Sequence, residues 1–456
     1  MTMLSTVEYE ARRVPTAGDR YLMLLSIVLL GYALMGKGFA YIGLPPLYIG
    51  EIAYLIGILA FARSGACLAT FASPPSLVLA VLMLWAVART VPFLGVYGID
   101  ALRDSVLVLY GGFAFIVIAL LLEDARRIDV VLRYYSFFVG TFPVMLVAYA
   151  AVRFWQDYIP SFYGPNIPIL DVQATAVGMH LAGAAVFVLI GYRKASPFWL
   201  VTWLGLFALI GTINRGALLS VFVPVVLAMV VLGRWRLMLT AATTAVALLG
   251  VAYMLEASYT HFHEAEDSEK RPVSAHQVVD NIKGIFGEGG EQAKGTKQWR
   301  LDWWDVIMEK AFQGSNFWLG RGFGLDLATA DGFETPADPS DPRPPPPSRS
   351  PHSVHLNLLA RMGVPGLVLW VLLLVSWGVM MLKAILTARS RGHQEWTGLF
   401  LFISCYVLSI IINASFDVVI EGPMQGIWFW CLLGFGIGSV MVYRSQVVSD
   451  EGDPAE

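Results

Sequence analysis

Long apolar segments recur along this chain of 456 residues and are separated by short polar boundaries. A helix needs about 20 apolar residues to cross the hydrocarbon core of a bilayer. Because backbone polar groups must be satisfied inside lipid, such segments are expected to be helical. The pattern therefore predicts an all-α polytopic membrane protein with about twelve transmembrane helices: 21–37, 46–62, 75–94, 102–122, 129–152, 173–192, 197–213, 216–233, 237–256, 364–386, 396–414 and 424–443.

Basic residues fall at every second boundary of this pattern, beginning with Arg12, Arg13 and Arg20 before the first segment. Lys and Arg mark the cytoplasmic loops of membrane proteins. We therefore predict cytoplasmic tails at residues 1–20 and 444–456, helices 1–9 within 21–256, and helices 10–12 within 352–443. The remaining stretch, 257–351, is predicted to be one large hydrophilic loop on the opposite, extracytoplasmic side of the membrane.

Composition agrees with a membrane protein and excludes several other classes. The chain is 57% hydrophobic and only 14% charged, whereas soluble domains carry roughly 25% charged residues. No basic domain is present, so nucleic acid is not expected as a partner. Cys67, Cys405 and Cys431 all lie in or beside apolar segments. Their positions therefore predict neither a disulfide framework nor a thiolate metal site.

The large loop contains a segment with helical spacing, "QWRLDWWDVIMEKAF", that places Trp299, Trp303, Val306 and Ile307 on one face. Trp-rich amphipathic helices often lie on the membrane surface, and we expect this one to do so. A later run, "PRPPPP", favours an extended polyproline spacer. Between them, "GRGFG" lacks the strand, helix and lysine of a phosphate-binding loop and is better interpreted as a tight turn.

Three arginines are expected near the same membrane face. Arg215 stands between two apolar segments in "GTINRGALLS", and intramembrane arginines usually face a polar cavity; snorkelling to the interface is the alternative. Arg300 could instead be a solvated charge paired with Asp302. Arg103 could instead pair with Asp100 or Asp104.

Two histidines, His352 and His355, stand three residues apart where the loop meets the tenth predicted span. This spacing predicts that they share a helix face. A neutral imidazole is an effective general base near pH 7. The alternatives are helix capping and interface packing, or a metal site that would need His261 or His263 as a further ligand.

These pieces, taken in order, resemble the O-antigen ligase/polymerase family of bacterial envelope proteins. The matching elements are "NRGALLS", then "WRLDWWDVIMEKAF" followed by "GRGFG", then "HSVHLNLLARMGVPGL". The resemblance covers about residues 200–385. The chain departs from the family pattern at Ser353, where asparagine is common, and at Arg361, where an acidic residue often stands.

The resemblance implies a GT-C-like helical bundle in the bacterial inner membrane, with 257–351 as a large periplasmic loop and the active site facing the periplasm. Such a protein transfers a glycan from undecaprenyl pyrophosphate to an acceptor hydroxyl on a glycan, lipid or protein. It assigns pyrophosphate binding to Arg215 and Arg300, and the role of base to His352. We expect further substrate-binding residues around them, with membrane lipid holding the donor's tail: Arg103, Asn214, His355, Arg321, Trp303 and Trp304.

The leaving pyrophosphate must be neutralised, and the chain has no Asp-x-Asp pair to hold a divalent metal. Guanidinium groups match phosphate oxygens and can replace the metal, so we predict metal-independent transfer without a cofactor. Two alternatives stay open. One is a polymerase that extends a surface polysaccharide on its own carrier, and the other is a transporter or flippase of lipid-linked glycans.

Overall fold

Helices make up almost all of the regular structure in the computed structural model, which describes residues 15–162, 167–260, 274–285, 291–334 and 349–448. The N-terminal part contains α1 (Ala17–Met35), α2 (Lys37–Ala40), α3 (Ile49–Arg63), η1 (Leu68–Phe71), α4 (Pro74–Thr90), η2 (Val91–Phe93), α5 (Leu94–Tyr97), α6 (Ile99–Leu109), α7 (Gly112–Glu123), α8 (Arg127–Gly140), α9 (Phe142–Trp155) and η3 (Gln156–Tyr158). Strands β1 (Gly43–Leu44) and β2 (Leu47–Tyr48) form a short antiparallel pair in which Gly43 faces Tyr48.

The remaining elements continue the same helical design. They are α10 (Ala174–Ile190), α11 (Pro197–Gly211), α12 (Arg215–Val231), α13 (Trp235–Thr260), α14 (Ala275–Ile285), α15 (Glu291–Phe312), α16 (Leu327–Asp331), α17 (Val354–Ser390), α18 (Gln394–Ala414), α19 (Pro423–Val442) and η4 (Tyr443–Val448). The all-α class and the membrane-spanning character of the chain therefore agree with the apolar pattern.

Fewer helices than predicted have the length and hydropathy of a membrane span among the described residues. Six helical segments of the described chain are long and apolar enough to cross a membrane, or up to eight if two bent pairs, α6 with α7 and α8 with α9, each form one span. These pairs bend by 41° and 51°, and α10, α11 and α12 are apolar but short. The fifteen-residue α3 also carries Glu51 and Arg63. The prediction of twelve spans is thus not confirmed, because bends and short helices interrupt the apolar segments.

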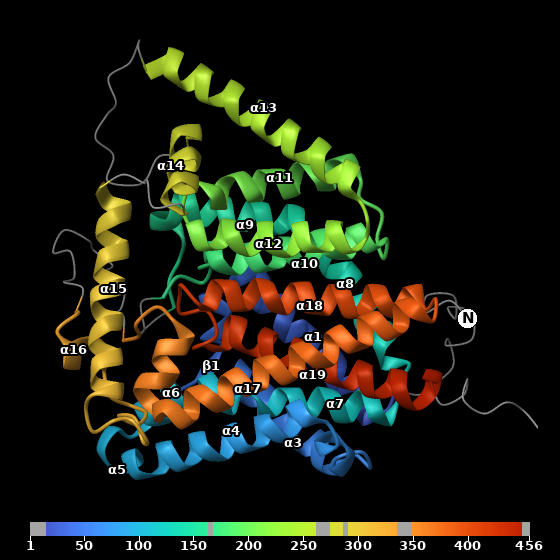
Figure 1. The fold of residues 1–456 in the computed structure, drawn as a ribbon, viewed down its shortest axis with the longest axis vertical. Helices are drawn as coiled ribbons and strands as arrows, with labels where there is room; N and C mark the ends of the chain where they lie inside the picture. Colours follow the sequence, from blue (N-terminus) through green and yellow to red (C-terminus); the bar gives the residue numbers. More distant parts are fainter. Residues whose placement is uncertain (1–14, 163–166, 261–273, 286–290, 335–348, 449–456) are drawn as a thin grey trace, which may run out of the picture.

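Close helix packing forms the centre of the bundle. Gly434 of α19 lies against α7 so closely that a Cβ there would stand 2.5 Å from the backbone oxygen of Ala114. Small residues at such crossings let the helix backbones approach closely. The van der Waals packing that results contributes to helix association in lipid. By contrast, α13 stands apart from the bundle (Figure 1), and none of its apolar window is buried. Its apolar side chains therefore face outward.

Helices α14, α15 and α16 gather at one end of the bundle, where α15 runs across the other helices (Figure 1). The prediction that α15 lies on the membrane surface stays a prediction. Its buried side chains Trp303 and Ile307 pack in one cluster with Leu359 and Ala360 of α17. The predicted polyproline spacer, and also His261 and His263, lie outside the described residues.

Helix α17 breaks at Gly363, where φ is +69°, and its first segment ends there. The last carbonyls of a helix have no partner within it. Here the backbone N–H groups of Arg321 and Gly322 donate to the carbonyls of Ala360 and Arg361, at 2.7 and 2.9 Å. The "GRGFG" segment, called the turn below, bends at Arg321, Phe323 and Gly324, has positive φ at three glycines, and caps the first segment of α17.

A buried carboxylate, Asp331, holds the loop elements together. Arg321 donates to both of its oxygens, Lys310 pairs with it, and the Trp303 indole donates to it at 2.9 Å. Burial alone would raise the pKa of Asp331, but the hydrogen bonds from Arg321, Lys310 and Trp303 lower it below its ordinary value. This cluster connects α15, the turn and α16.

The turn provides a matched pair of glycines for a stability test. Gly320 (φ +60°) and Gly332 (φ +77°) share a left-handed backbone, so an alanine costs about 1 kcal/mol in strain at either position. A Cβ at Gly320 would also stand 2.5 Å from backbone atoms of α17, whereas Gly332 has open space. We expect Gly320→Ala to lower the melting temperature of the solubilised protein well beyond Gly332→Ala. Equal shifts would contradict the capping role of the turn.

The Asp331 cluster predicts a pH-dependent contribution to stability. Because the folded pKa of Asp331 lies below its ordinary value of 3.8, the ionised group stabilises the fold above pH 3.8 and loses this effect as the pH falls further. The melting temperatures of the wild-type protein and Asp331→Asn should therefore differ most at pH 6 and converge below pH 3.8. A gap that stays constant from pH 6 to pH 3 would show that the charge does not matter.

Candidate functional site

Arg215 is the first residue of α12, at the end of the bundle where the loop helices lie. Asn214 caps this helix, because its side-chain oxygen accepts the backbone N–H of Ala217 at 3.0 Å. Arg215 itself is half-buried and points to the C-terminal end of α14, where its Nη1 lies 3.4 Å from the carbonyl oxygen of Gly284. A helix N-terminus attracts anions, so the guanidinium and the helix dipole add up to one positive region.

Arg300 of α15 reaches the same region from the other side. Its Nη1 donates to the carbonyl oxygen of Phe416 at 2.6 Å, and its buried Nε has no hydrogen-bond partner among the described residues. Burial lowers the pKa of Arg300, Asp417 opposes this effect, and the positive charge of Arg215 lowers the pKa further. The two arginines therefore lie close enough for their charges to repel each other. Two neighbouring positive charges of this kind suit a multiply charged anion.

His352 and Asp417 form a hydrogen-bonded pair beside Arg300. The His352 Nδ1 and an Asp417 carboxylate oxygen are 3.1 Å apart, and both side chains are about a quarter exposed or less. The Trp299 ring makes a T-shaped contact with the imidazole, with ring centres 5.9 Å apart. An imidazole that donates from Nδ1 to a carboxylate carries its lone pair on Nε2, which can then accept a proton.

The Asp417 carboxylate is kept ionised by its surroundings. Burial raises the pKa of Asp417, but the hydrogen bond and charge of His352, the backbone N–H of Val418 and the charge of Arg300 lower it below the ordinary value. Asp417 can therefore orient His352 and stabilise its protonated form. None of the three sequence elements includes Asp417, although it is one of only two acidic residues in the stretch "NASFDVVIEG" between the last two spans.

The backbone at His352 adopts an unusual conformation with φ +54°. Left-handed conformations in residues other than glycine are uncommon, and they cluster at functional sites when the surroundings hold them. Here Trp304 donates from its indole to the carbonyl of Pro351 at 2.7 Å, and Ser350 donates to Glu421 at 2.6 Å. These two contacts fix the segment that presents His352.

The prediction that His352 and His355 share a helix face is wrong. Helix α17 begins at Val354, so only His355 is helical. Both ring nitrogens of His355 are engaged, since Nδ1 accepts from the Trp370 indole at 3.1 Å and Nε2 lies 3.0 Å from the Ser415 hydroxyl. Ser353 takes the N-cap position, but its side chain makes no capping hydrogen bond. His355 thus joins α17 to the end of α18.

Other residues assigned to substrate binding have structural partners. Arg321 and Trp303 bind Asp331, and Asn214 caps α12. Arg103 pairs with Asp100 and Asp104 at 3.0 and 3.3 Å, which is the alternative to substrate binding that the sequence left open. A role for any of them in substrate binding stays a prediction. The structure brings together Arg215, Arg300 and His352. Trp304 contacts the carbonyl of Pro351, the residue before His352.

The comparisons with known proteins bear on the part of the chain that contains this site. Residues 200–371 match the model of the O-antigen ligase family, and this range includes Arg215, Arg300 and His352. No curated protein matches the chain. The family is associated with glycosyl transfer of the ligase or polymerase type, which implies a lipid-linked glycan donor and an acceptor in the membrane. The resemblance carried by the three sequence elements is thus confirmed, and the match over residues 200–371 supports an O-antigen ligase-like family for this chain.

Proposed function

We propose that this protein transfers a glycan from undecaprenyl pyrophosphate to an acceptor hydroxyl at the periplasmic face of the bacterial inner membrane, as an O-antigen ligase does. The proposal depends on the arrangement in which Arg300 lies between two partners. On one side is Arg215 at the start of α12, and on the other is the His352–Asp417 pair. A cationic region beside an oriented imidazole is what this reaction needs.

The two arginines bind the pyrophosphate. Guanidinium groups present planar donors that fit phosphate oxygens, and the Nε of Arg300 is a donor that has no protein partner among the described residues. An anion between Arg215 and Arg300 would also relieve their mutual repulsion. This binding is aimed at charge that develops as the leaving group departs, where electrostatic stabilisation contributes most to the rate.

His352 acts on the acceptor. The acceptor oxygen forms a bond to C1 of the donor's first sugar, while the bond from C1 to the pyrophosphate oxygen breaks and its electron pair leaves with the pyrophosphate. Nε2 of His352 takes the proton of the acceptor hydroxyl. Asp417 holds the ring by its hydrogen bond to Nδ1 and stabilises the imidazolium that results.

A deletion strain tests the overall reaction. Accumulation of full-length glycan on its lipid carrier is the expected result for a ligase. Accumulation of single repeat units would assign the protein as a polymerase instead. Normal amounts of both intermediates, together with normal surface glycan, would contradict glycosyl transfer altogether.

The arginines should be essential for transfer but not for insertion. We expect Arg215→Ala and Arg300→Ala each to reduce transfer on the order of 10²–10³-fold, because each removes a fixed donor to developing charge. Arg126→Ala is the matched control, since Arg126 is exposed and pairs with Asp124. Membrane levels should be equal in all variants, and EDTA should leave wild-type activity unchanged. Near-normal transfer by both site variants would remove these arginines from the mechanism.

His352 and Asp417 should affect turnover more than donor binding. Asparagine tolerates left-handed backbone, so His352→Asn removes the base without adding strain; it should reduce kcat about 10²–10⁴-fold with a nearly constant KM for the donor. Asp417→Asn should also lower kcat, because it no longer favours the His352 tautomer that donates from Nδ1 and accepts at Nε2. Asp305→Asn, at an exposed position of α15, is the control. A rise in KM without a loss of kcat would instead assign the pair to binding.

A further inference from the structure

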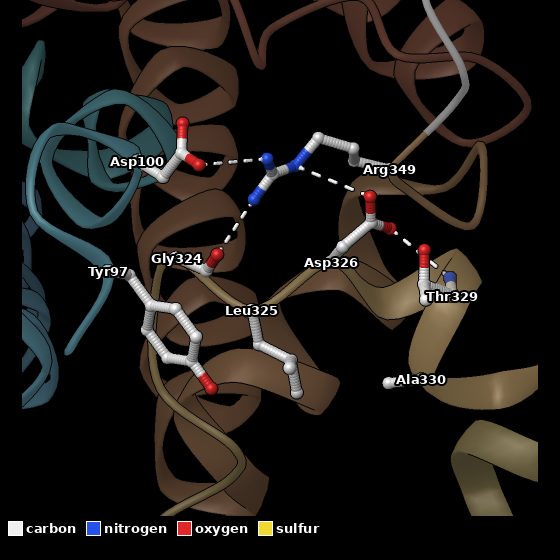
Figure 2. Close-up of a pocket in the computed structure, with 8 residues that line it drawn as sticks. All are labelled: Tyr97, Asp100, Gly324, Leu325, Asp326, Thr329, Ala330 and Arg349. Atoms are coloured by element: carbon white, nitrogen blue, oxygen red, sulfur yellow. Dashed lines mark hydrogen bonds and ion pairs between the residues drawn. The ribbon is translucent and has the colours of Figure 1, made fainter.

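A pocket separate from the arginine and histidine site lies beside the turn that caps α17, with a volume of about 400 Å³. Figure 2 shows its main groups: the ring of Tyr97 from α5 on one side, Asp326 and Thr329 at the start of α16 on the other, and Arg349 with Asp100 above them. None of these five residues belongs to the arginine and histidine site. The pocket combines an aromatic ring with several polar groups that converge from different elements, which is the usual composition of a small-molecule site.

The charges around this pocket are balanced, unlike those around Arg215 and Arg300. Three guanidinium groups face three carboxylates: Arg103, Arg349 and Arg361 against Asp100, Asp104 and Asp326. Arg349 is held by Asp100 at 3.1 Å and by the carbonyl of Gly324 at 2.7 Å. A pyrophosphate would meet the carboxylates of Asp100 and Asp326 in the lining itself. The electrostatics therefore favour an uncharged, hydroxyl-rich ligand over an anion.

The polar groups of the lining retain capacity for such a ligand. One oxygen of Asp326 caps α16 by accepting the backbone N–H groups of Ala328 and Thr329, while the other lies 4.0 Å from Arg349, beyond hydrogen-bond distance. A carboxylate can accept several hydrogen bonds, so Asp326 and the half-exposed Asp100 can still accept from hydroxyl groups. The hydroxyls of Tyr97 and Thr329 make no hydrogen bond to the described residues and can donate or accept.

The Tyr97 ring is held in place by its neighbours. It stacks on Phe93 with ring centres 6.0 Å apart. It also lies against Gly324, where an added Cβ would stand 2.5 Å from Tyr97. Gly324 has φ +100°, so the close approach and the backbone conformation both require glycine. A fixed aromatic face of this kind can pack against the C–H face of a pyranose ring while the surrounding carboxylates accept its hydroxyls.

The pocket is also near the proposed reaction centre along the chain. Arg349 precedes His352 by three residues, and three extended residues span at most about 11 Å. The intervening residues are fixed, since Ser350 binds Glu421 and Pro351 binds Trp304. A saccharide chain that reacts at His352 can thus reach the pocket one or two sugar units away.

We propose that the pocket formed by Tyr97, Asp100, Asp326, Thr329 and Arg349 is a saccharide-binding subsite, which takes an uncharged sugar unit of the glycan substrates away from the reacting bond. This inference rests on the proposed glycosyl transfer for its choice of ligand. The sugar belongs either to the donor glycan or to the acceptor, and the chemistry of the pocket fits both sources.

Binding of free saccharides to the full-length protein in nanodiscs tests the subsite apart from catalysis. One probe is the oligosaccharide released by mild acid from the host's lipid carrier, and the other is the oligosaccharide released from the host's surface acceptor. We expect one of them to bind the wild-type protein. Tyr97→Ala and Thr329→Val should each weaken that binding, the first by about tenfold. Tyr158→Ala, at a highly exposed position in η3, should leave it unchanged.

The outcomes separate this subsite from the proposed reaction. His352→Asn should lower the rate of transfer as stated above, yet it should bind the oligosaccharide as the wild-type protein does. The probe that loses affinity in both pocket variants identifies the source of the sugar. If neither probe binds, or if binding is the same in Tyr97→Ala, Thr329→Val and Tyr158→Ala, the subsite is refuted even when transfer is confirmed. If binding depends on Tyr97 but the protein transfers no glycan, the proposed function fails and the subsite stands.

Discussion

The contact on which this end of the molecule depends is the closure of the "GRGFG" turn on the broken end of α17's first segment. Two backbone N–H groups of the turn satisfy the carbonyls of Ala360 and Arg361, and Gly363 provides the break in the helix. Unsatisfied carbonyls inside a membrane protein are costly, so this cap decides where the loop can sit. The same turn places Gly324 against Tyr97 and brings α15 over α17. Both the proposed reaction centre and the pocket beside Tyr97 therefore depend on one local arrangement of backbone.

Charge compensation separates the arginines of this region into two groups. Arg361 is buried and is bound by Asp104, Asn357 and the carbonyl of Leu325, so it holds the first segment of α17 in place. Removing one partner of a buried ion pair costs about 3–5 kcal/mol, which explains why such an arginine is structural. Arg300 is different, because it keeps a buried donor without a hydrogen-bond partner among the described residues and faces the charge of Arg215. Surplus positive charge, not the mere presence of arginine, is what points to an anionic substrate.

Several conclusions were available from local patterns. The apolar segments predicted the positions of the helices, because hydrophobic length is a property of consecutive residues. The bends at the junctions of α6 with α7 and of α8 with α9 were not predictable in this way, since they depend on how neighbouring helices pack. The three sequence elements predicted the family and brought Arg215, Arg300 and His352 forward, but they assigned six further residues to substrate binding without knowing their partners. Among these, Arg321 and Trp303 bind Asp331, and both nitrogens of His355 are engaged.

The sequence by itself determined the helical membrane class, the location of the loop between α13 and α17 and the identity of the family elements, because each of these is carried by residues close together in the chain. Only the tertiary structure decided that Asp417 orients His352 across 65 residues, and that Arg349 meets Asp100 across 249. Such pairs form only when distant segments pack, and they decide whether a charged side chain is compensated by a partner in the protein. The same residue type can therefore hold the fold at one position and bind substrate at another, and the chain alone does not distinguish the two.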